Sequence, residues 1–174
     1  QTVQTATRAI ARSEGPIAII GGTGLGKTIC CLRIAEYFRH AFDIITLSSA
    51  ALVTRRALLQ NLLYELKLPY KDLSEGELRL SLVNRLQPSP DVNTDGVLLM
   101  IDEAQVLSLK LLDEIRLLTN IQRNGLPRVR LVLCGNLKLE EILCNPQMDS
   151  LNQRLASRCY LTPLSREETA RYVI

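Results

Sequence analysis

The feature that most constrains this chain is a run of eight residues near its start that satisfies the pattern G-x-x-x-x-G-K-[ST]. The run consists of Gly21, Gly22, Thr23, Gly24, Leu25, Gly26, Lys27 and Thr28. The apolar residues 17–20 predict a buried strand before it, and the apolar periodicity of 28–39 predicts a helix after it. In this arrangement the N–H groups of the loop and the helix dipole form a site for an anion.

This pattern, known as Walker A, predicts contacts with a nucleoside triphosphate and its metal ion. Lys27 is expected to reach the β- and γ-phosphates, and the hydroxyl of Thr28 is expected to ligate Mg²⁺. The alternative is an ordinary strand-to-helix turn that happens to be rich in glycine, and the strand and helix patterns on either side argue against it. We therefore expect the chain to bind a nucleoside triphosphate.

Length and composition set broad limits. At 174 residues the chain is expected to form one domain with a single substantial core. The net charge of +3 permits nucleic acid binding without arguing for it. No apolar stretch approaches the ~20 residues needed to cross a bilayer, so we expect a cytoplasmic location, and Gln1 indicates that the true N-terminus is absent. The five cysteines lack metal-ligand spacing, and we expect all of them to be buried small hydrophobes in a reducing cytosol.

Strand and helix patterns alternate along the chain, which predicts a parallel sheet in an α/β sandwich. The expected strands are 17–20, 43–47, 97–101, 129–134 and 160–161. The expected helices are 3–12, 28–39, 55–66, 75–86, 109–121, 139–143 and 150–156, with a further helix after Ser165. Ser74 and Glu77 form a predicted capping box at the start of helix 75–86. Residues 87–96 are polar and contain prolines, and predict a loop.

Two acids, Asp102 and Glu103, directly follow the apolar strand 97–101. Acids at the carboxyl end of such a strand lie where open parallel sheets bind their ligands. Asp102 is expected to hold Mg²⁺, directly or through water, as in a Walker B motif. Glu103 is expected to act as the general base on the water that attacks the γ-phosphate. The alternative is that both acids only cap the next segment, and the glycine-rich run upstream argues against it.

Three further polar residues are candidates for the same chemistry. Asn136 follows the strand 129–134 and is expected to bond the γ-phosphate or the lytic water, although forming a turn is an alternative role. Arg154 and Arg158 are four residues apart and are expected to share one helix face. They form either a solvated basic surface or an arginine finger that enters the site of a neighbouring subunit.

The sequence resembles the AAA+ ATPase superfamily and, within it, the ExeA/GspA-type ATPases of the general secretion pathway protein A family. The agreement is carried by the phosphate-loop pattern and by segments 101–105, 112–120, 131–136 and 153–164. The resemblance implies a P-loop NTPase fold, a three-layer α/β/α sandwich whose five-stranded parallel sheet has the order 5-1-4-3-2. It also implies an ATPase core over 1–164 and the start of a truncated helical lid over 165–174.

The resemblance further implies an enzyme that uses ATP and Mg²⁺ in a homo-oligomeric ring or filament. Asn136 would be the first sensor, Arg154 the arginine finger acting in trans, and Arg158 the second candidate for that finger. Ser48 would hold Glu103 inactive until a ligand binds. Two departures are that the family often has Gly-Gln at Gly135-Asn136, and that the second sensor arginine cannot be located in 165–174.

Two functions are compatible with these features. The first is a secretion-associated ATPase that acts on a protein partner at the cell envelope, with inner-membrane association in the full-length protein. The second is a DNA-binding ATPase of the transposition-helper (MuB/TniB) type that recruits a transposase. For the second, Arg123, Arg128 and Arg130 would face a duplex, unless they are a solvated surface. A module that binds nucleotide without hydrolysing it is a third class, and the intact Lys27 and Glu103 argue against it.

Overall fold

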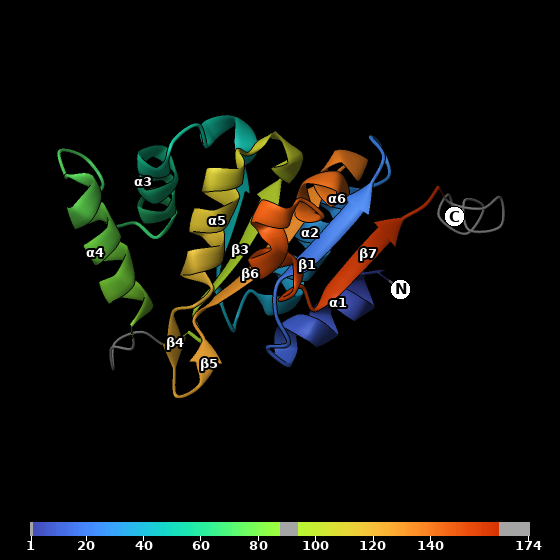
Figure 1. Cartoon of the computed structure of the whole chain (residues 1–174). Coiled ribbons are helices and arrows are strands. Elements are labelled where there is room, and N and C mark those ends of the chain that lie inside the picture. The colour runs from blue at the N-terminus through green and yellow to red at the C-terminus, as the bar shows by residue number, and fades with distance from the viewer. Residues whose placement is uncertain (1, 88–93, 164–174) are drawn as a thin grey trace.

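The computed structural model describes residues 2–87 and 94–163. Its centre is a parallel sheet with the order β2-β3-β6-β1-β7 (Figure 1). The strands are β1 (Ile17–Gly21), β2 (Asp43–Ser48), β3 (Val97–Asp102), β6 (Val129–Gly135) and β7 (Ser157–Leu161). This order confirms the predicted 5-1-4-3-2 arrangement and the P-loop α/β fold. The expected start of a helical lid at 165–174 and most of the loop 87–96 lie outside the described residues.

Helices cover both faces of the sheet and complete the three layers (Figure 1). One face packs against α1 (Thr2–Ala11) and α2 (Lys27–Phe38). The other face packs against α3 (Arg55–Glu65), α4 (Glu75–Leu86), α5 (Leu109–Leu118), α6 (Leu137–Leu143) and α7 (Asp149–Asn152). Short 3₁₀ segments lie at η1 (Ser49–Ala51), η2 (Ala104–Val106) and η3 (Pro146–Met148). Because both faces are covered, β6 is buried along its whole length and β3 over its first five residues.

Local signals and buried charges fix the helices on the second face. Ser74 accepts a hydrogen bond from the backbone N–H of Glu77, whose side chain bonds back, so the predicted capping box of α4 is confirmed. Glu114 of α5 is only 2% exposed, and its carboxylate pairs with Arg55 of α3 and Arg79 of α4. This ionic network ties α3, α4 and α5 together.

The segment before β7 differs from the prediction. The helix α7 ends at Asn152, Arg154 lies in a turn, and Arg158 belongs to β7. The prediction that the two arginines share a helix face is therefore wrong. The strand forms because β7 pairs with β1 along its full length, starting where Ala156 donates a backbone hydrogen bond to Pro16.

A two-stranded hairpin, β4 (Gln122–Arg123) and β5 (Leu126–Pro127), follows α5. The prediction extended the helix to residue 121 and treated the following Asn124 and Gly125 only as its end. These two residues have φ values of 50° and 76°. Positive φ at both central positions gives the type I′ turn that joins tightly paired antiparallel strands.

Candidate functional site

The carboxyl ends of neighbouring strands bring the candidate site together at one edge of the sheet, here termed the carboxyl edge. In the parallel register, Ser48 of β2 pairs with Asp102 of β3. In the same way Ile20 of β1 pairs with Gly135 of β6. The glycine-rich loop (21–28), Asp102 and Gly135 therefore leave the sheet at this shared edge, which is where open parallel sheets bind ligands.

The glycine-rich loop turns directly into α2 through two residues with positive φ. Gly24 has a φ of 79°, and Gly26, the N-cap of α2, has a φ of 84°. Only glycine adopts such angles without strain. Lys27 is 7% exposed, and its Nζ donates hydrogen bonds of 3.0 Å to the carbonyl oxygens of Gly21 and Gly22. Lys27 is thus folded back over the loop, and its ammonium group bonds two uncharged carbonyl oxygens.

The two halves of the predicted site meet at Thr28 and Asp102. These residues are 74 positions apart, and the Thr28 Oγ1 donates a 3.0 Å hydrogen bond to Asp102 Oδ2. The other carboxylate oxygen, Oδ1, accepts a 2.9 Å bond from the backbone N–H of Glu103. A hydroxyl and a carboxylate side by side are hard oxygen ligands of the kind that Mg²⁺ prefers. The donor set therefore fits the predicted metal ion.

Glu103 is exposed at the carboxyl edge and adopts a left-handed backbone conformation with a φ of 54°. Its Oε2 accepts a 2.5 Å hydrogen bond from Nε2 of Gln105, which lies in η2. Ser48 lies at the end of the adjacent strand β2. Among the hydrogen bonds of the described residues, the partner of the Glu103 side chain is Gln105, and no bond joins Glu103 to Ser48.

Asn136 is the N-cap of α6 at the end of β6. Its Oδ1 accepts a 2.9 Å hydrogen bond from the backbone N–H of Lys138, so the turn-forming role considered from the sequence is present. Its own backbone N–H donates a 3.2 Å bond to Gln105 Oε1. Gln105 thus contacts both Glu103 and Asn136. Sequence reasoning missed this residue as a member of the site, although it stands two positions after Glu103.

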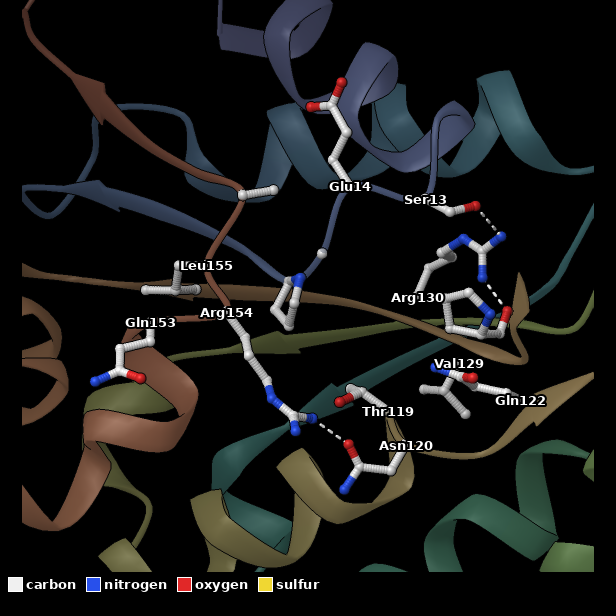
Figure 2. Close-up of a pocket in the computed structure, with 14 residues that line it drawn as sticks. Ser13, Glu14, Thr119, Asn120, Gln122, Val129, Arg130, Gln153, Arg154 and Leu155 are labelled. Atoms are coloured by element: carbon white, nitrogen blue, oxygen red, sulfur yellow. Dashed lines mark hydrogen bonds between the residues drawn. The ribbon is translucent and has the colours of Figure 1, made fainter. Parts of the chain in front are cut away.

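The predicted arginines lie away from this edge. Arg154 lines a cavity of about 300 Å³ at the opposite edge, termed the amino edge, where β1, β6 and β7 begin. Its guanidinium donates to Asn120 Oδ1, just after α5 (Figure 2). Arg158 lies in β7 and donates to Asn152 Oδ1. The structure therefore brings together Lys27 and Thr28 of the loop with the polar residues of the carboxyl edge, and leaves both arginines out.

Comparison with known families settles which family the chain belongs to. A family model described as an AAA domain matches residues 10–143, which is most of the chain. The chain belongs to the AAA domain family. The structural comparison agrees on the fold, because two solved structures superpose on nearly the whole chain. These are the Aeropyrum pernix ORC2 protein in ADPNP–ADP complexes and Cdc6p of Pyrobaculum aerophilum.

The ORC2 structure has a TM-score of 0.74 at 14% identity and covers 99% of this chain and 48% of the ORC2 chain. Cdc6p has a TM-score of 0.76 at 19% identity, with 98% and 47% covered. A Drosophila ORC structure bound to GC-rich DNA and Cdc6 has a TM-score of 0.63 at 11% identity, with 93% and 28% covered. At these identities the likeness concerns the fold.

A curated relative is more similar in sequence. General secretion pathway protein A of Aeromonas hydrophila is 30% identical over 160 residues, which cover 91% of this chain and 29% of that protein. The predicted resemblance to this protein family is confirmed. The chain spans less than a third of the relative's length. Within the described residues, no helix has both the length and the apolarity required of a membrane span.

Two of the three arginines expected to face a DNA duplex are buried. Arg128 and Arg130 are 6% and 8% exposed. Arg128 donates to the carbonyl oxygen of Leu86, and Arg130 donates to Ser13 and Pro127 (Figure 2). Burial lowers the pKa of both guanidinium groups from the usual arginine value. The prediction that Arg128 and Arg130 face a duplex is wrong, because their donors bond groups of this chain. Arg123 is exposed in the hairpin. The DNA-binding alternative is not favoured.

The cysteines also differ in part from the expectation. Cys31, Cys134 and Cys159 are buried, but Cys144, just after α6, is exposed, so burial does not account for all five. The Sγ atoms of Cys31 in α2 and Cys134 in β6 are 2.9 Å apart. The hydrogen bond from Cys134 lowers the pKa of Cys31, and the same bond and burial raise the pKa of Cys134. This contact packs α2 against the centre of the sheet behind the glycine-rich loop.

Proposed function

We propose that this AAA domain binds Mg·ATP at the glycine-rich loop and hydrolyses it, and that hydrolysis changes the packing of an oligomer. The observation that carries the proposal is the 3.0 Å contact between Thr28 Oγ1 and Asp102 Oδ2, which joins the loop to the acidic end of β3. The ADPNP–ADP complexes of the ORC2 relative support nucleotide binding by this fold.

Lys27 is the residue that exchanges partners when a nucleotide binds. Its ammonium group holds the carbonyl oxygens of Gly21 and Gly22. A β- or γ-phosphate oxygen is a charged acceptor and forms a stronger bond with an ammonium group than a carbonyl does. Binding therefore draws Lys27 from the loop backbone to the phosphates, while the loop N–H groups and the start of α2 hold the rest of the anion.

Thr28 and Asp102 are the residues that would hold Mg²⁺. The ion would neutralise negative charge that develops on the phosphates during hydrolysis. Thr28 presents its hydroxyl oxygen and Asp102 its Oδ2. Asp102 Oδ1 stays on the backbone N–H of Glu103, which fixes the orientation of the carboxylate.

Glu103 is the proposed general base. Its carboxylate takes a proton from water as the water oxygen forms a bond to the γ-phosphorus, and the bond from that phosphorus to the bridging oxygen breaks to give ADP and phosphate. Asn136 uses Oδ1 to cap α6, so its Nδ2 is the donor proposed to bond the γ-phosphate or the attacking water.

Arg154 is proposed to complete the site of a neighbouring subunit. The seven residues of β6 separate the two edges of the sheet by roughly 20 Å at the usual rise of a strand. From the amino edge Arg154 therefore acts in trans, on the γ-phosphate bound by another copy. Arg158, held in β7, is the second candidate. The assembly of Drosophila ORC with Cdc6 supports an oligomeric role.

The relative's name gives the proposed setting. General secretion pathway protein A is named for secretion, so we place this ATPase in a secretion-associated role. It would act from the cytoplasm on a protein partner at the cell envelope.

Multiple-turnover phosphate release from Mg·ATP tests the proposal. Lys27→Ala should abolish nucleotide binding and turnover together. Glu103→Gln should keep ATP affinity and lower kcat by about 10²- to 10⁴-fold, the usual contribution of a general base. Glu141→Gln, which changes an exposed acid of α6, is the matched control and should leave both quantities unchanged. Absence of turnover in the wild-type protein, or full turnover in Glu103→Gln, would overturn the proposal.

A further inference from the structure

We propose that Gln105 is a positioning residue that holds Glu103 in place and couples it to the end of β6. This inference rests on the proposed hydrolysis and concerns how the base is oriented. Gln105 lies in η2, and one side-chain amide contacts both partners. Nε2 donates to Glu103 Oε2 at 2.5 Å, and Oε1 accepts from the backbone N–H of Asn136 at 3.2 Å.

The chemistry of these two contacts needs an amide. Glu103 presents an acceptor and the Asn136 backbone presents a donor, so the bridging group must donate at one end and accept at the other. A carboxylate at position 105 accepts only, and an aliphatic side chain does neither. The planar amide also transmits a displacement of one end to the other, because its oxygen and nitrogen are rigidly joined.

The neighbouring backbone is shaped around this amide. A Cβ placed on Gly135 would lie 2.6 Å from Gln105 Oε1 and 2.8 Å from the side chain of Leu139. Any side chain at 135 would therefore displace the glutamine or α6. Glycine at the end of β6 leaves room for Gln105 to reach across from η2. This close approach accounts for a glycine at position 135.

Holding the base with a neutral group suits its task. Glu103 is exposed and its side chain bonds a neutral amide, whereas the buried Glu114 is paired with the guanidinium groups of Arg55 and Arg79. A bond between two charged groups is stronger than a bond from a neutral amide, so Gln105 orients Glu103 without holding it as tightly as Glu114 is held. The amide of Gln105 fixes Oε2 of Glu103 and leaves Oε1 to take the proton from water.

The second contact links the base to the proposed γ-phosphate sensor. Asn136 is the residue whose side chain is proposed to bond the γ-phosphate, and its backbone N–H is the group that Gln105 accepts. When the end of β6 shifts with the state of the nucleotide, the amide of Gln105 shifts with it and moves Glu103. Gln105 thus takes the part that the resemblance assigned to Ser48.

Two variants separate the two contacts. Gln105→Leu removes both, and a misplaced base should lower kcat by about 10²-fold while ATP affinity and the melting temperature stay close to wild type. Gln105→Glu keeps an acceptor for the Asn136 N–H but sets a second carboxylate against Glu103. Repulsion between the two carboxylates should displace Glu103, so this variant should also lower kcat while ATP affinity stays close to wild type. Gln147→Leu changes an exposed glutamine elsewhere and is the control.

The decisive comparison repeats Gln105→Leu in the Glu103→Gln background. If Gln105 acts through Glu103, the second substitution should cause no further loss of kcat. Wild-type kcat in Gln105→Leu, wild-type kcat in Gln105→Glu, or equal losses in both backgrounds would each overturn the inference. These outcomes leave the proposed hydrolysis intact, because that proposal fails only if the wild-type protein lacks turnover or Glu103→Gln retains it.

Discussion

The two edges of the sheet use polar side chains in opposite ways. At the carboxyl edge, Thr28 and Glu103 are exposed, and their bonds run to side chains of the same small cluster. At the amino edge, Arg128 and Arg130 are buried, and their guanidinium groups bond backbone carbonyls from distant segments. The carboxyl edge therefore leaves polar groups accessible to a ligand. At the amino edge the buried guanidinium groups stabilise the fold.

The same contrast between accessible and buried polar groups distinguishes two arginines of the amino edge, Arg130 and Arg154. Arg130 bonds the carbonyls of Ile10 and Pro127 and lies over the ring of Phe42 at 5.4 Å. Arg154, at the same edge, is exposed and has a side-chain amide as its partner. An exposed arginine with one exchangeable partner is free to change partners, whereas a buried one with several backbone acceptors is not.

The largest expected effect is a loss of kcat on replacing Arg154, the exposed arginine. Arg154→Ala should lower kcat about 10³-fold, because an arginine finger contributes at least that much, with little change in melting temperature. Mixing Arg154→Ala with Glu103→Gln should restore turnover above that of either variant alone, since an intact site then meets an intact finger. No recovery in a mixed oligomer would contradict action in trans.

Arg130 should show the reverse behaviour. Arg130→Met keeps an apolar stem but leaves buried carbonyl acceptors without partners, and we expect a loss of about 2–4 kcal/mol in the free energy of unfolding. Urea unfolding measures this loss. Arg123→Met, an exposed arginine of the hairpin, should change stability by no more than about 0.5 kcal/mol. Equal losses of stability in the two variants would contradict a structural role for the buried Arg130.

The smallest expected effect separates the two roles of Asn136. Asn136→Ser keeps a cap for the N–H of Lys138 but removes the amide nitrogen, so stability should hold while kcat falls. Asn136→Ala removes the cap as well and should cost about 1 kcal/mol more in unfolding free energy. Thermal unfolding and phosphate release, measured on the same samples, check the pair. Retention of wild-type kcat in Asn136→Ser would leave Asn136 with a capping role alone.

Much of the carboxyl edge was predictable because its signals are local. The glycine-rich loop and the acids after strand 97–101 are short motifs, and the alternation of strands and helices implies that their ends meet. Gln105 belongs to segment 101–105, which carries the family resemblance, but it received no role from the sequence because its partners depend on how η2 and β6 meet in the fold. Its role appears only when Asn136 is brought beside it.

The amino edge was harder to predict because burial there depends on distant contacts. Arg128 and Arg130 carry no sign in the sequence that Leu86 and Ile10 will supply acceptors. The strand predicted at 160–161 is longer in the structure, where β7 begins at Ser157. Cys159 is buried between the exposed Arg158 and Tyr160, which is the alternation of a strand. The pair Asn124-Gly125 likewise favours a hairpin, and the helical interpretation of 109–121 concealed it.

The central claim is that the glycine-rich loop, Thr28 and Asp102 hold Mg·ATP, and a crystal structure with Mg²⁺ and a non-hydrolysable ATP analogue tests it most directly. The account predicts phosphates within the loop, Lys27 moved from the carbonyls of Gly21 and Gly22 to the phosphate oxygens, and the metal ion beside Thr28 and Asp102. An analogue bound elsewhere, or a loop that stays closed on Lys27 at saturating analogue, would contradict the account.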